Sequence, residues 1–415
     1  MSTEWRLRPL GEVAHVEMGQ SPPSEHVSEK SESGLAFLQG NAEFSDLYPH
    51  PRLRCSKPLK KAKNGDALIS VRAPVGAINR ADQDYCIGRG LAAIRFIHAD
   101  PDYGYHALAF VASNLRKVAQ GTTFEAVGGK DLRGLEFPDS PPHEQRRIAD
   151  ILDTLDEAIR KTEQVIAKLQ QMKQGLLHDL LTRGIDENGE LRDPERHPEQ
   201  FKDSPLGRIP RSWVAKTLGE VASIIDPNPS HRYPDAVTEG VPIASTENFV
   251  GEDDFDLASA ALVPWYVLRQ QHTRCSYAEE DVIFARKGRI GFARRYGTHQ
   301  KVFSHTIVVM KPRGAIDSSF LLWLVRSRLF FSGIRKRMNT NSGVPTLGVD
   351  FLGRVSVPQP SQEEQRRIAR ILDDLQSQLI AEKSELIKLQ ALKNGLMDDL
   401  FSGRVRVAVH EETTS

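Results

Sequence analysis

The 415-residue sequence lacks the features of membrane proteins and of disulfide-stabilised proteins. No stretch approaches 18 consecutive apolar residues, so no membrane-spanning helix is expected. The first residues also lack the apolar core of a secretory signal. Only three cysteines occur, Cys55, Cys86 and Cys275. Their odd number and the absence of a CxxC pair support neither a disulfide framework nor a zinc site. We therefore expect a cytoplasmic protein with reduced thiols.

Motifs for several kinds of catalysis are also missing. The sequence has no GxxxxGK[ST] phosphate loop and no HExxH metal pair, and its 13 histidines are scattered. It has no Asn-Pro-Pro-Tyr or Asp-Pro-Pro-Tyr segment of the kind used in adenine methylation, and Asp-Pro-Asn-Pro at 226–229 does not fit that pattern. These absences favour a chain with no catalysis of its own and no cofactor or metal of its own. A carboxylate-based nuclease centre is too degenerate to recognise, so a self-contained DNA methyltransferase or nuclease stays open as the alternative.

The net charge is zero, but the charge is unevenly distributed. Residues 265–337 contain 15 Lys and Arg against 4 Asp and Glu, and residues 52–95 contain 10 against 3. Two separate basic regions in a neutral chain fit a polyanion that is bound at two places. A solvated charged surface is the alternative interpretation.

One unit is written twice in the chain. Residues 144–185 and 364–405 align without a gap and match at 18 of 42 positions, too many for chance. Upstream, Trp-x4-Leu-Gly-Glu-Val-Ala begins at Trp5 and again at Trp213. A short apolar run at 66–69 leads into a basic loop ending at Gly76, and a similar run at 281–284 leads into a loop ending at Gly291. Each half therefore predicts a domain followed by one long helix.

Short β-rich runs bounded by Gly, Pro and Asn predict mixed domains. The predicted fold class is α/β (α+β), with two recognition domains related by a pseudo-two-fold axis and separated by an antiparallel pair of long helices. The expected boundaries are a first domain at 1–140, a first helix at 141–185, a polar linker at 186–212, a second domain at 213–360, a second helix at 361–405 and a disordered tail at 406–415.

The long helices carry apolar residues at alternating steps of four and three, which is the pattern of a heptad seam. Two such helices in one chain can bury their seams on each other, and the intervening domain lets them run antiparallel. A seam of roughly 48 Å, at about 1.5 Å per residue, exceeds one DNA turn of ~34 Å. The pair would then act as a ruler between the domains. A dimerisation zipper is the alternative. The predicted pairing residues are Ile148, Leu152, Leu155, Ile159, Ile166, Leu169, Ile368, Leu372, Leu375, Leu379, Leu386 and Leu389.

The ordered set of these motifs, present twice over about residues 5–405, resembles the specificity subunit of a type I restriction–modification system. The resemblance implies that each domain reads one half of a split sequence in double-stranded DNA. It also implies that the helices space the domains and dock two modification (methyltransferase) subunits, joined by restriction (motor-nuclease) subunits. S-adenosylmethionine, ATP and Mg would belong to those partners, and this chain would be a non-catalytic subunit.

The basic glycine loops and their surroundings supply the candidate DNA contacts, because such loops allow close approach to phosphate. The loops at 121–126 and 341–346 lie at matching places and suit close backbone approach, with a plain turn as the alternative. For each basic side chain, a surface role without DNA contact is the alternative. The predicted DNA-binding residues are Lys60, Lys61, Lys63 and Arg72 in the first half and Arg286, Lys287, Arg289, Arg294 and Arg295 in the second.

Overall fold

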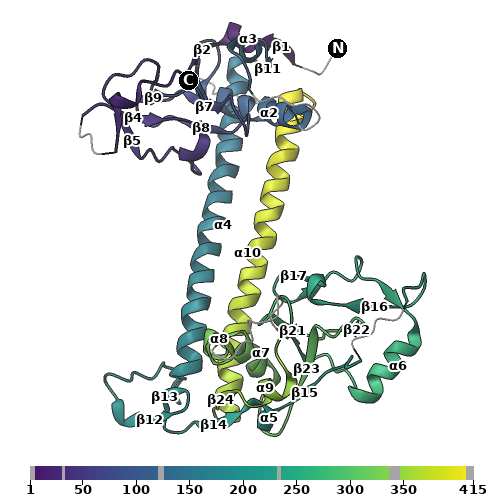
Figure 1. Ribbon diagram of the computed structural model, residues 1–415. Helices are drawn as coiled ribbons and strands as arrows, with labels where there is room; N and C mark the ends of the chain where they lie inside the picture. Colours follow the sequence, from purple (N-terminus) through teal and green to yellow (C-terminus); the bar gives the residue numbers. More distant parts are fainter. Residues whose placement is uncertain (1–4, 30–32, 120–125, 231–234, 336–345, 408–415) are drawn as a thin grey trace, which may run out of the picture. The chain divides into compact units, whose positions relative to one another are not determined.

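The computed structural model describes residues 5–29, 33–119, 126–230, 235–335 and 346–407 (Figure 1). The chain divides into two compact units, one formed by Met1–Val165 with Glu382–Ser415 and the other by Ile166–Ala381. Each unit contains one of the predicted domains together with part of each long helix. Most of the predicted tail, residues 408–415, lies outside the described residues.

The first unit is built on two sheets. One is antiparallel with the order β2 (Ala14–Met18), β10 (Leu91–Phe96), β7 (Ala67–Ser70) and β8 (Ile78–Arg80). The other has the order β3 (Val27–Ser28), β5 (Leu53–Cys55), β4 (Leu35–Leu38), β9 (Tyr85–Ile87) and β6 (Lys61–Ala62), with β4 and β9 parallel. The remaining elements are β1 (Arg6–Pro9), which pairs with β11 (Glu136–Asp139), and the helices α1 (Leu10–Val13), α2 (Pro101–Ala119), α3 (Gly129–Arg133) and α4 (Pro142–Thr182).

The second unit repeats this plan. Its antiparallel sheet has the order β15 (Ala222–Ile225), β23 (Ile307–Pro312), β20 (Val282–Ala285) and β21 (Ala293–Arg295). A smaller sheet has the order β19 (Leu262–Val263), β16 (Val241–Ala244) and β22 (Val302–Phe303), with β16 and β22 parallel. Other strands of this unit are β14 (Val214–Thr217), which pairs with β24 (Ser356–Gln359), and the pair β17 (Phe249–Val250) and β18 (Asp254–Phe255). Its helices are α5 (Leu218–Val221), α6 (Trp265–Arg274), α7 (Ser318–Arg326), α8 (Arg328–Arg335), α9 (Val349–Gly353) and α10 (Gln362–Ser402). The prediction of two repeated α/β domains is confirmed.

A buried aspartate explains the acidic residue that opens the matching apolar runs. Asp66, 3% exposed, lies just before β7 and forms two hydrogen bonds of 2.8 Å with Arg95 on the neighbouring strand β10. Asp281, also 3% exposed, lies just before β20 and pairs with Lys311 on β23. A buried carboxylate needs such a partner, because an unpaired charge is costly to bury. The repeated Asp therefore fixes the start of a central strand in each unit.

A buried glutamine near the start of each long helix holds the helix against its domain. Gln145 accepts a hydrogen bond from the Asp100 backbone N–H at 2.8 Å and donates to the Ser140 carbonyl. Gln365 accepts from the Asp317 N–H at 2.8 Å and donates to the Pro360 carbonyl. The Gln of the repeated Glu-Gln-Arg-Arg segment thus joins the helix to the segment that precedes α2 or α7.

The Glu of the same segment forms what we call the carboxylate clasp. In the second unit, Glu364 accepts hydrogen bonds from Arg192 Nη1 at 2.6 Å, from Trp213 Nε1 at 3.0 Å and from the Ile185 backbone N–H at 3.0 Å. Arg192 and Ile185 follow α4, whereas Glu364 begins α10. The clasp therefore joins the start of one long helix to the segment after the other.

The first unit has a clasp of the same design. Glu144, near the start of α4, accepts a hydrogen bond from Arg406 Nε at 3.0 Å, and Arg406 follows α10. The Arg406 guanidinium lies 4.0 Å from the ring centre of Trp5, whose Nε1 donates to the Leu400 carbonyl. The hydrogen bond from Arg406 lowers the pKa of the Glu144 carboxyl. The repeated tryptophans, Trp5 and Trp213, each complete a clasp.

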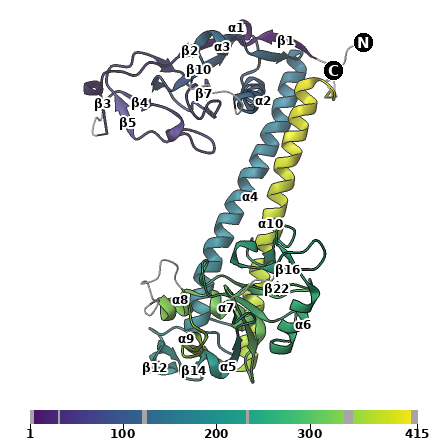
Figure 2. The same cartoon turned by 45° about the vertical axis from the view of Figure 1, so that its right-hand side comes forward.

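Within each unit, the parts of α4 and α10 that belong to it run side by side (Figures 1 and 2), and the unit buries part of their shared seam. In the first unit, Ile148 and Leu152 near the start of α4 share a core with Leu400 near the end of α10. In the second unit, Leu180 near the end of α4 shares a core with Ile368 and Leu372 near the start of α10. The pairing within each unit is therefore antiparallel.

All of the predicted pairing residues are buried or half-buried. Besides Ile148, Leu152, Ile368 and Leu372, the buried members are Ile166, Leu375 and Leu379, and the half-buried ones are Leu155, Ile159, Leu169, Leu386 and Leu389. Polar pairs flank the seam at the positions where the heptad has a gap. Lys173 donates to Gln376 Oε1 at 2.8 Å in the second unit, and Lys393 pairs with Asp156 in the first.

The polar connector between the halves has regular structure. It forms a hairpin of β12 (Phe201–Ser204) and β13 (Gly207–Pro210), and buries Phe201 and Ile209. It also supplies Arg192 to the clasp. The segment predicted as a linker at 186–212 is thus part of the second unit.

Candidate nucleic-acid interface

The basic glycine loops lie at equivalent places in the two units. Arg72 follows β7 and its backbone forms a bridge with Ala126, whereas Lys287 follows β20 and bridges Thr346. In both cases the loop therefore lies beside a second predicted loop. Of those second loops, residues 121–125 and 341–345 lie outside the described residues. The Arg72 side chain is exposed, and the Lys287 side chain is half-buried. Neither side chain is fully buried in its own domain.

Three of the predicted DNA-binding arginines each donate at least two hydrogen bonds within the second unit. Arg286 is 6% exposed, and it donates to Asp226 Oδ2 at 2.6 Å and to the His305 carbonyl at 3.0 Å. Arg295 donates to Asp373 Oδ2 at 3.2 Å, which joins β21 to α10. These contacts hold the domain together and leave less of each guanidinium for an outside partner.

Arg294 is the most deeply buried of the three. It is 1% exposed, its guanidinium lies 4.0 Å from the Phe249 ring centre, and it donates to the Val250 and Asp254 carbonyls. Burial lowers its pKa to about 10. Its place predicts a structural role, because a side chain enclosed by its own domain cannot reach a phosphate.

Replacing Arg294 with alanine is expected to lower the free energy of unfolding by roughly 3 kcal/mol, since it removes the hydrogen bonds and ring contact of a buried side chain and opens a cavity. Lys287→Ala is the matched control, because the Lys287 side chain has no hydrogen-bonded partner among the described residues. Its effect is expected within about 0.5 kcal/mol. Urea unfolding of both variants measures the difference, and equal stabilities would contradict a structural role for Arg294.

The remaining candidates are more accessible. Arg289 is exposed and donates to the Phe249 carbonyl at 2.9 Å. Lys60 pairs with Glu17 and Lys63 with Asp84, each at 2.6 Å, and both side chains are more than 40% exposed. Lys61 is exposed on β6. Exposed pairs contribute only about 0–1 kcal/mol, so these lysines can exchange their carboxylates for another anion.

The connection that carries these lysines has an equivalent that the sequence reasoning missed. Lys60, Lys61 and Lys63 lie between β5 and β7. In the second unit, the corresponding connection between β19 and β20 forms α6. The available signal was a ten-residue segment, residues 265–274, with two arginines and no acidic residue. Alignment of the two halves does not reveal this segment, because the first half has no matching helix.

No cluster of three or more His, Cys, Asp or Glu side chains that could hold a metal ion occurs in the described ranges. The three cysteines are free and buried. Among the helices of the described part of the chain, none is long and apolar enough to cross a membrane. The candidate interface is thus made of basic and polar side chains.

These features define a class of protein: a chain with two copies of one α/β domain, each with a basic glycine loop and joined to a long helix. The family model for the type I restriction modification DNA specificity domain matches residues 2–171 and again residues 210–390. The chain belongs to this family. Two such domains in one chain fit the recognition of a bipartite DNA target, and the alternative of a self-contained DNA enzyme is not favoured.

Individual relatives have the same description. A Methanocaldococcus jannaschii protein assigned as the MjaX type I restriction enzyme specificity subunit is 37% identical over 186 residues, which cover 44% of each chain. This match therefore spans less than half of that relative. The MjaVIII type I restriction enzyme specificity subunit of the same organism is 24% identical over 314 residues, covering 74% of this chain and 71% of the relative. The crystal structure of a type I restriction–modification S subunit from M. genitalium has a TM-score of 0.62 at 19% identity and covers 96% of both chains, which shows a shared fold.

Proposed function

We propose that this chain is the DNA specificity subunit of a type I restriction–modification complex in the cytoplasm, and that each domain reads one half of a bipartite target. The observation that carries the proposal is the repetition itself. The same domain, basic loop and helix occur twice, and the DNA specificity family matches both copies. A single-site enzyme has no need of two equivalent binding domains.

The paired helices set the distance between the two half-sites in this proposal. Buried seam residues and the two clasps support a stiff connection, because each clasp joins the start of one helix to the segment that follows the other. Nothing in that arrangement depends on a second copy of the chain, which argues against a dimerisation zipper.

The outer surface of the helices docks the partner subunits. Several large apolar side chains on α4 and α10 remain at least 41% exposed, and they include Val165, Met172, Ile380, Ile387 and Leu392. Met172 lies off the seam and is exposed, whereas Ile151 and Leu177, which also lie off the seam, are half-buried. Exposed apolar side chains in such number are typical of surfaces that bind other proteins. The partners are two methyltransferase subunits and the restriction subunits.

The chain itself performs no catalysis in this proposal. S-adenosylmethionine, ATP and Mg belong to the partner subunits, and this subunit contributes sequence recognition and spacing. The unequal loops of the two domains support different half-sites, since Arg72 is followed by Ala73 and Pro74, whereas Lys287 lies between Arg286 and Gly288.

The purified chain, incubated with duplex DNA, Mg²⁺ and S-adenosylmethionine, is expected to bind DNA and to leave it unmodified. The affinity is expected to fall steeply with salt, because bound Lys and Arg displace counterions from phosphate. Addition of the methyltransferase subunits is expected to start adenine methylation. Gel-shift titration at several salt concentrations and detection of methylated adenine measure both effects. Turnover by the chain alone would favour the self-contained enzyme.

A further inference from the structure

The connection between β19 and β20 builds the helix α6, whose outer face is exposed. In α6, the side chains of Val267, Leu268 and Gln271 are buried, whereas the other seven are exposed. Val267 and Leu268 pack against the small sheet β19-β16-β22. In Figures 1 and 2 the helix lies on the side of the second unit away from α10.

Gln271 fixes the rotation of α6 about its own axis. Its Nε2 donates to the Phe303 carbonyl at 2.8 Å, and its Oε1 accepts from the Phe303 N–H at 3.0 Å and from the Tyr277 hydroxyl. Phe303 lies on β22, so the helix is joined to the sheet by both polar atoms of one buried side chain. The outer face is therefore presented in a single orientation, which sequence reading requires.

The outer face carries side chains suited to DNA. Arg269, Gln270 and Arg274 have no side-chain hydrogen bond or ion pair among the described residues. Trp265 is 48% exposed and Tyr266 is 53% exposed. The helix has no acidic residue. The arginines of α6 therefore differ from Arg286, Arg294 and Arg295, whose guanidinium groups donate hydrogen bonds to other groups of the domain.

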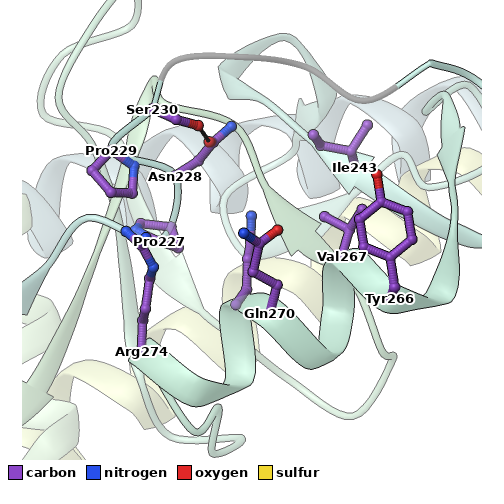
Figure 3. A pocket seen from close by; sticks show the side chains of 10 residues that line it. Pro227, Asn228, Pro229, Ser230, Ile243, Tyr266, Val267, Gln270 and Arg274 are labelled. Atoms are coloured by element: carbon purple, nitrogen blue, oxygen red, sulfur yellow. Dashed lines mark hydrogen bonds between the residues drawn. The ribbon is translucent and has the colours of Figure 1, made fainter.

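A row of three outer side chains faces a second element. Tyr266, Gln270 and Arg274 are spaced four residues apart, so they follow one side of the helix. They line a pocket of about 230 Å³ together with Asn228 and Ser230 of the loop after β15. Figure 3 shows Gln270 and Arg274 extending from α6 toward that loop. Pro227 and Pro229 restrict the backbone of the loop on either side of Asn228.

We propose that α6 is the helix by which the second domain reads bases in the DNA major groove, with Gln270 and Arg274 as specificity-determining residues. The major groove admits an α-helix, a Gln side chain can bind adenine N6 and N7, and an Arg side chain can bind guanine O6 and N7. Arg269 contacts backbone phosphate. This inference rests on the proposed DNA-recognition function, and it assigns one helix of one domain to one half-site.

A protein partner is the competing occupant of this face. Exposed Trp, Tyr and Arg are also enriched at protein interfaces. The lack of acidic residues in α6, and the lack of side-chain partners for Arg269 and Arg274 among the described residues, favour a polyanion over a protein. The first domain also supports a polyanion. Its equivalent connection carries Lys60, Lys61 and Lys63, so basic side chains are placed there in both units despite different local structure.

The test uses the full-length chain produced in a cell with its methyltransferase subunits, and the readout is the set of methylated adenines across the genome. Gln270→Ala and Arg274→Ala are each expected to relax base preference at one position of one half-site by about tenfold or more, and to leave the other half-site unchanged. Alanine favours the helix, so folding is expected to persist. Gln270→Glu gives a second readout, since a carboxylate accepts a hydrogen bond from cytosine N4 and is expected to shift the preference toward cytosine.

Arg354→Ala is the matched control, because Arg354 is exposed in the same unit and has no side-chain partner among the described residues. It is expected to leave both half-sites unchanged. An unchanged motif in the α6 variants overturns the inference, and so does slower methylation of an unchanged motif, which indicates phosphate contact alone. Weaker copurification of the methyltransferase subunits with an unchanged motif also overturns the inference, and assigns the face to protein. Failure of the proposed function is distinguishable, because the wild-type chain would then give no two-part motif.

Discussion

Replacing Glu364 with alanine is expected to lower the free energy of unfolding by about 3–5 kcal/mol, which is the usual cost of breaking a buried ion pair. The Glu364 carboxylate accepts four hydrogen bonds, and two of them come from Arg192, at 2.6 and 3.3 Å. Its removal leaves the Arg192 guanidinium and the fully buried Trp213 N–H without their acceptor. The contacts that are lost are those that join α10 to the connector and to the second domain.

Glu363→Ala is the matched control. Glu363 precedes Glu364 in the first turn of α10 and is exposed, so its loss is expected to cost about 0.5 kcal/mol or less. Urea unfolding followed by circular dichroism and by tryptophan fluorescence compares the two variants. A Glu364→Ala chain as stable as the Glu363→Ala chain would show that the clasp does not hold the unit together.

The sequence was sufficient to predict the repeated domains and the two long helices. Heptad spacing is a local signal, and alignment of the halves revealed the Trp and Glu-Gln motifs. The role of those motifs was not predictable, because Glu364 meets Arg192 across 172 residues and Trp213 across 151. No periodicity encodes such a long-range contact. Only the fold shows that the repeated Glu is a buried acceptor rather than a surface charge.

The candidate DNA contacts were harder to predict, because a basic residue looks the same in sequence whether it is paired or free. Arg286 and Arg289 are three residues apart in one loop, yet Arg286 is buried against Asp226 and Arg289 is exposed. Asp226 lies 60 residues away, so the difference could not be foreseen. The α6 face was not predicted because alignment of the two halves reveals only the residues that they share. Two different half-sites must be read by residues that differ between the two domains.

Removing residues 162–168 from α4 together with residues 381–387 from α10 is expected to bring the two half-sites closer by about three base pairs. Seven residues shorten a helix by about 10.5 Å, and the rise of DNA is about 3.4 Å per base pair. A whole heptad keeps the seam in register, because the apolar pattern repeats every seven residues. The bases read within each half-site are expected to stay the same, since neither domain is changed.

The two deletions are matched because the pairing has one register. In the first unit Asp156 pairs with Lys393, and in the second Lys173 pairs with Gln376. Asp156 and Lys173 on α4 are as far apart in sequence as Gln376 and Lys393 on α10. In this register, residues 162–168 pair with residues 381–387. Gln164→Ala combined with Lys383→Ala is the control, since it changes exposed side chains in both segments and keeps the length.

Mapping methylated adenines across the genome of a cell that makes each chain with its methyltransferase subunits tests the central claim most directly. The claim is that two separate domains read two half-sites at a distance set by the helices. It predicts two constant blocks of specified bases in every case, with a gap about three base pairs shorter for the double deletion and unchanged for the control. Active methylation by the double deletion with an unchanged gap, or with different bases in the blocks, would contradict it.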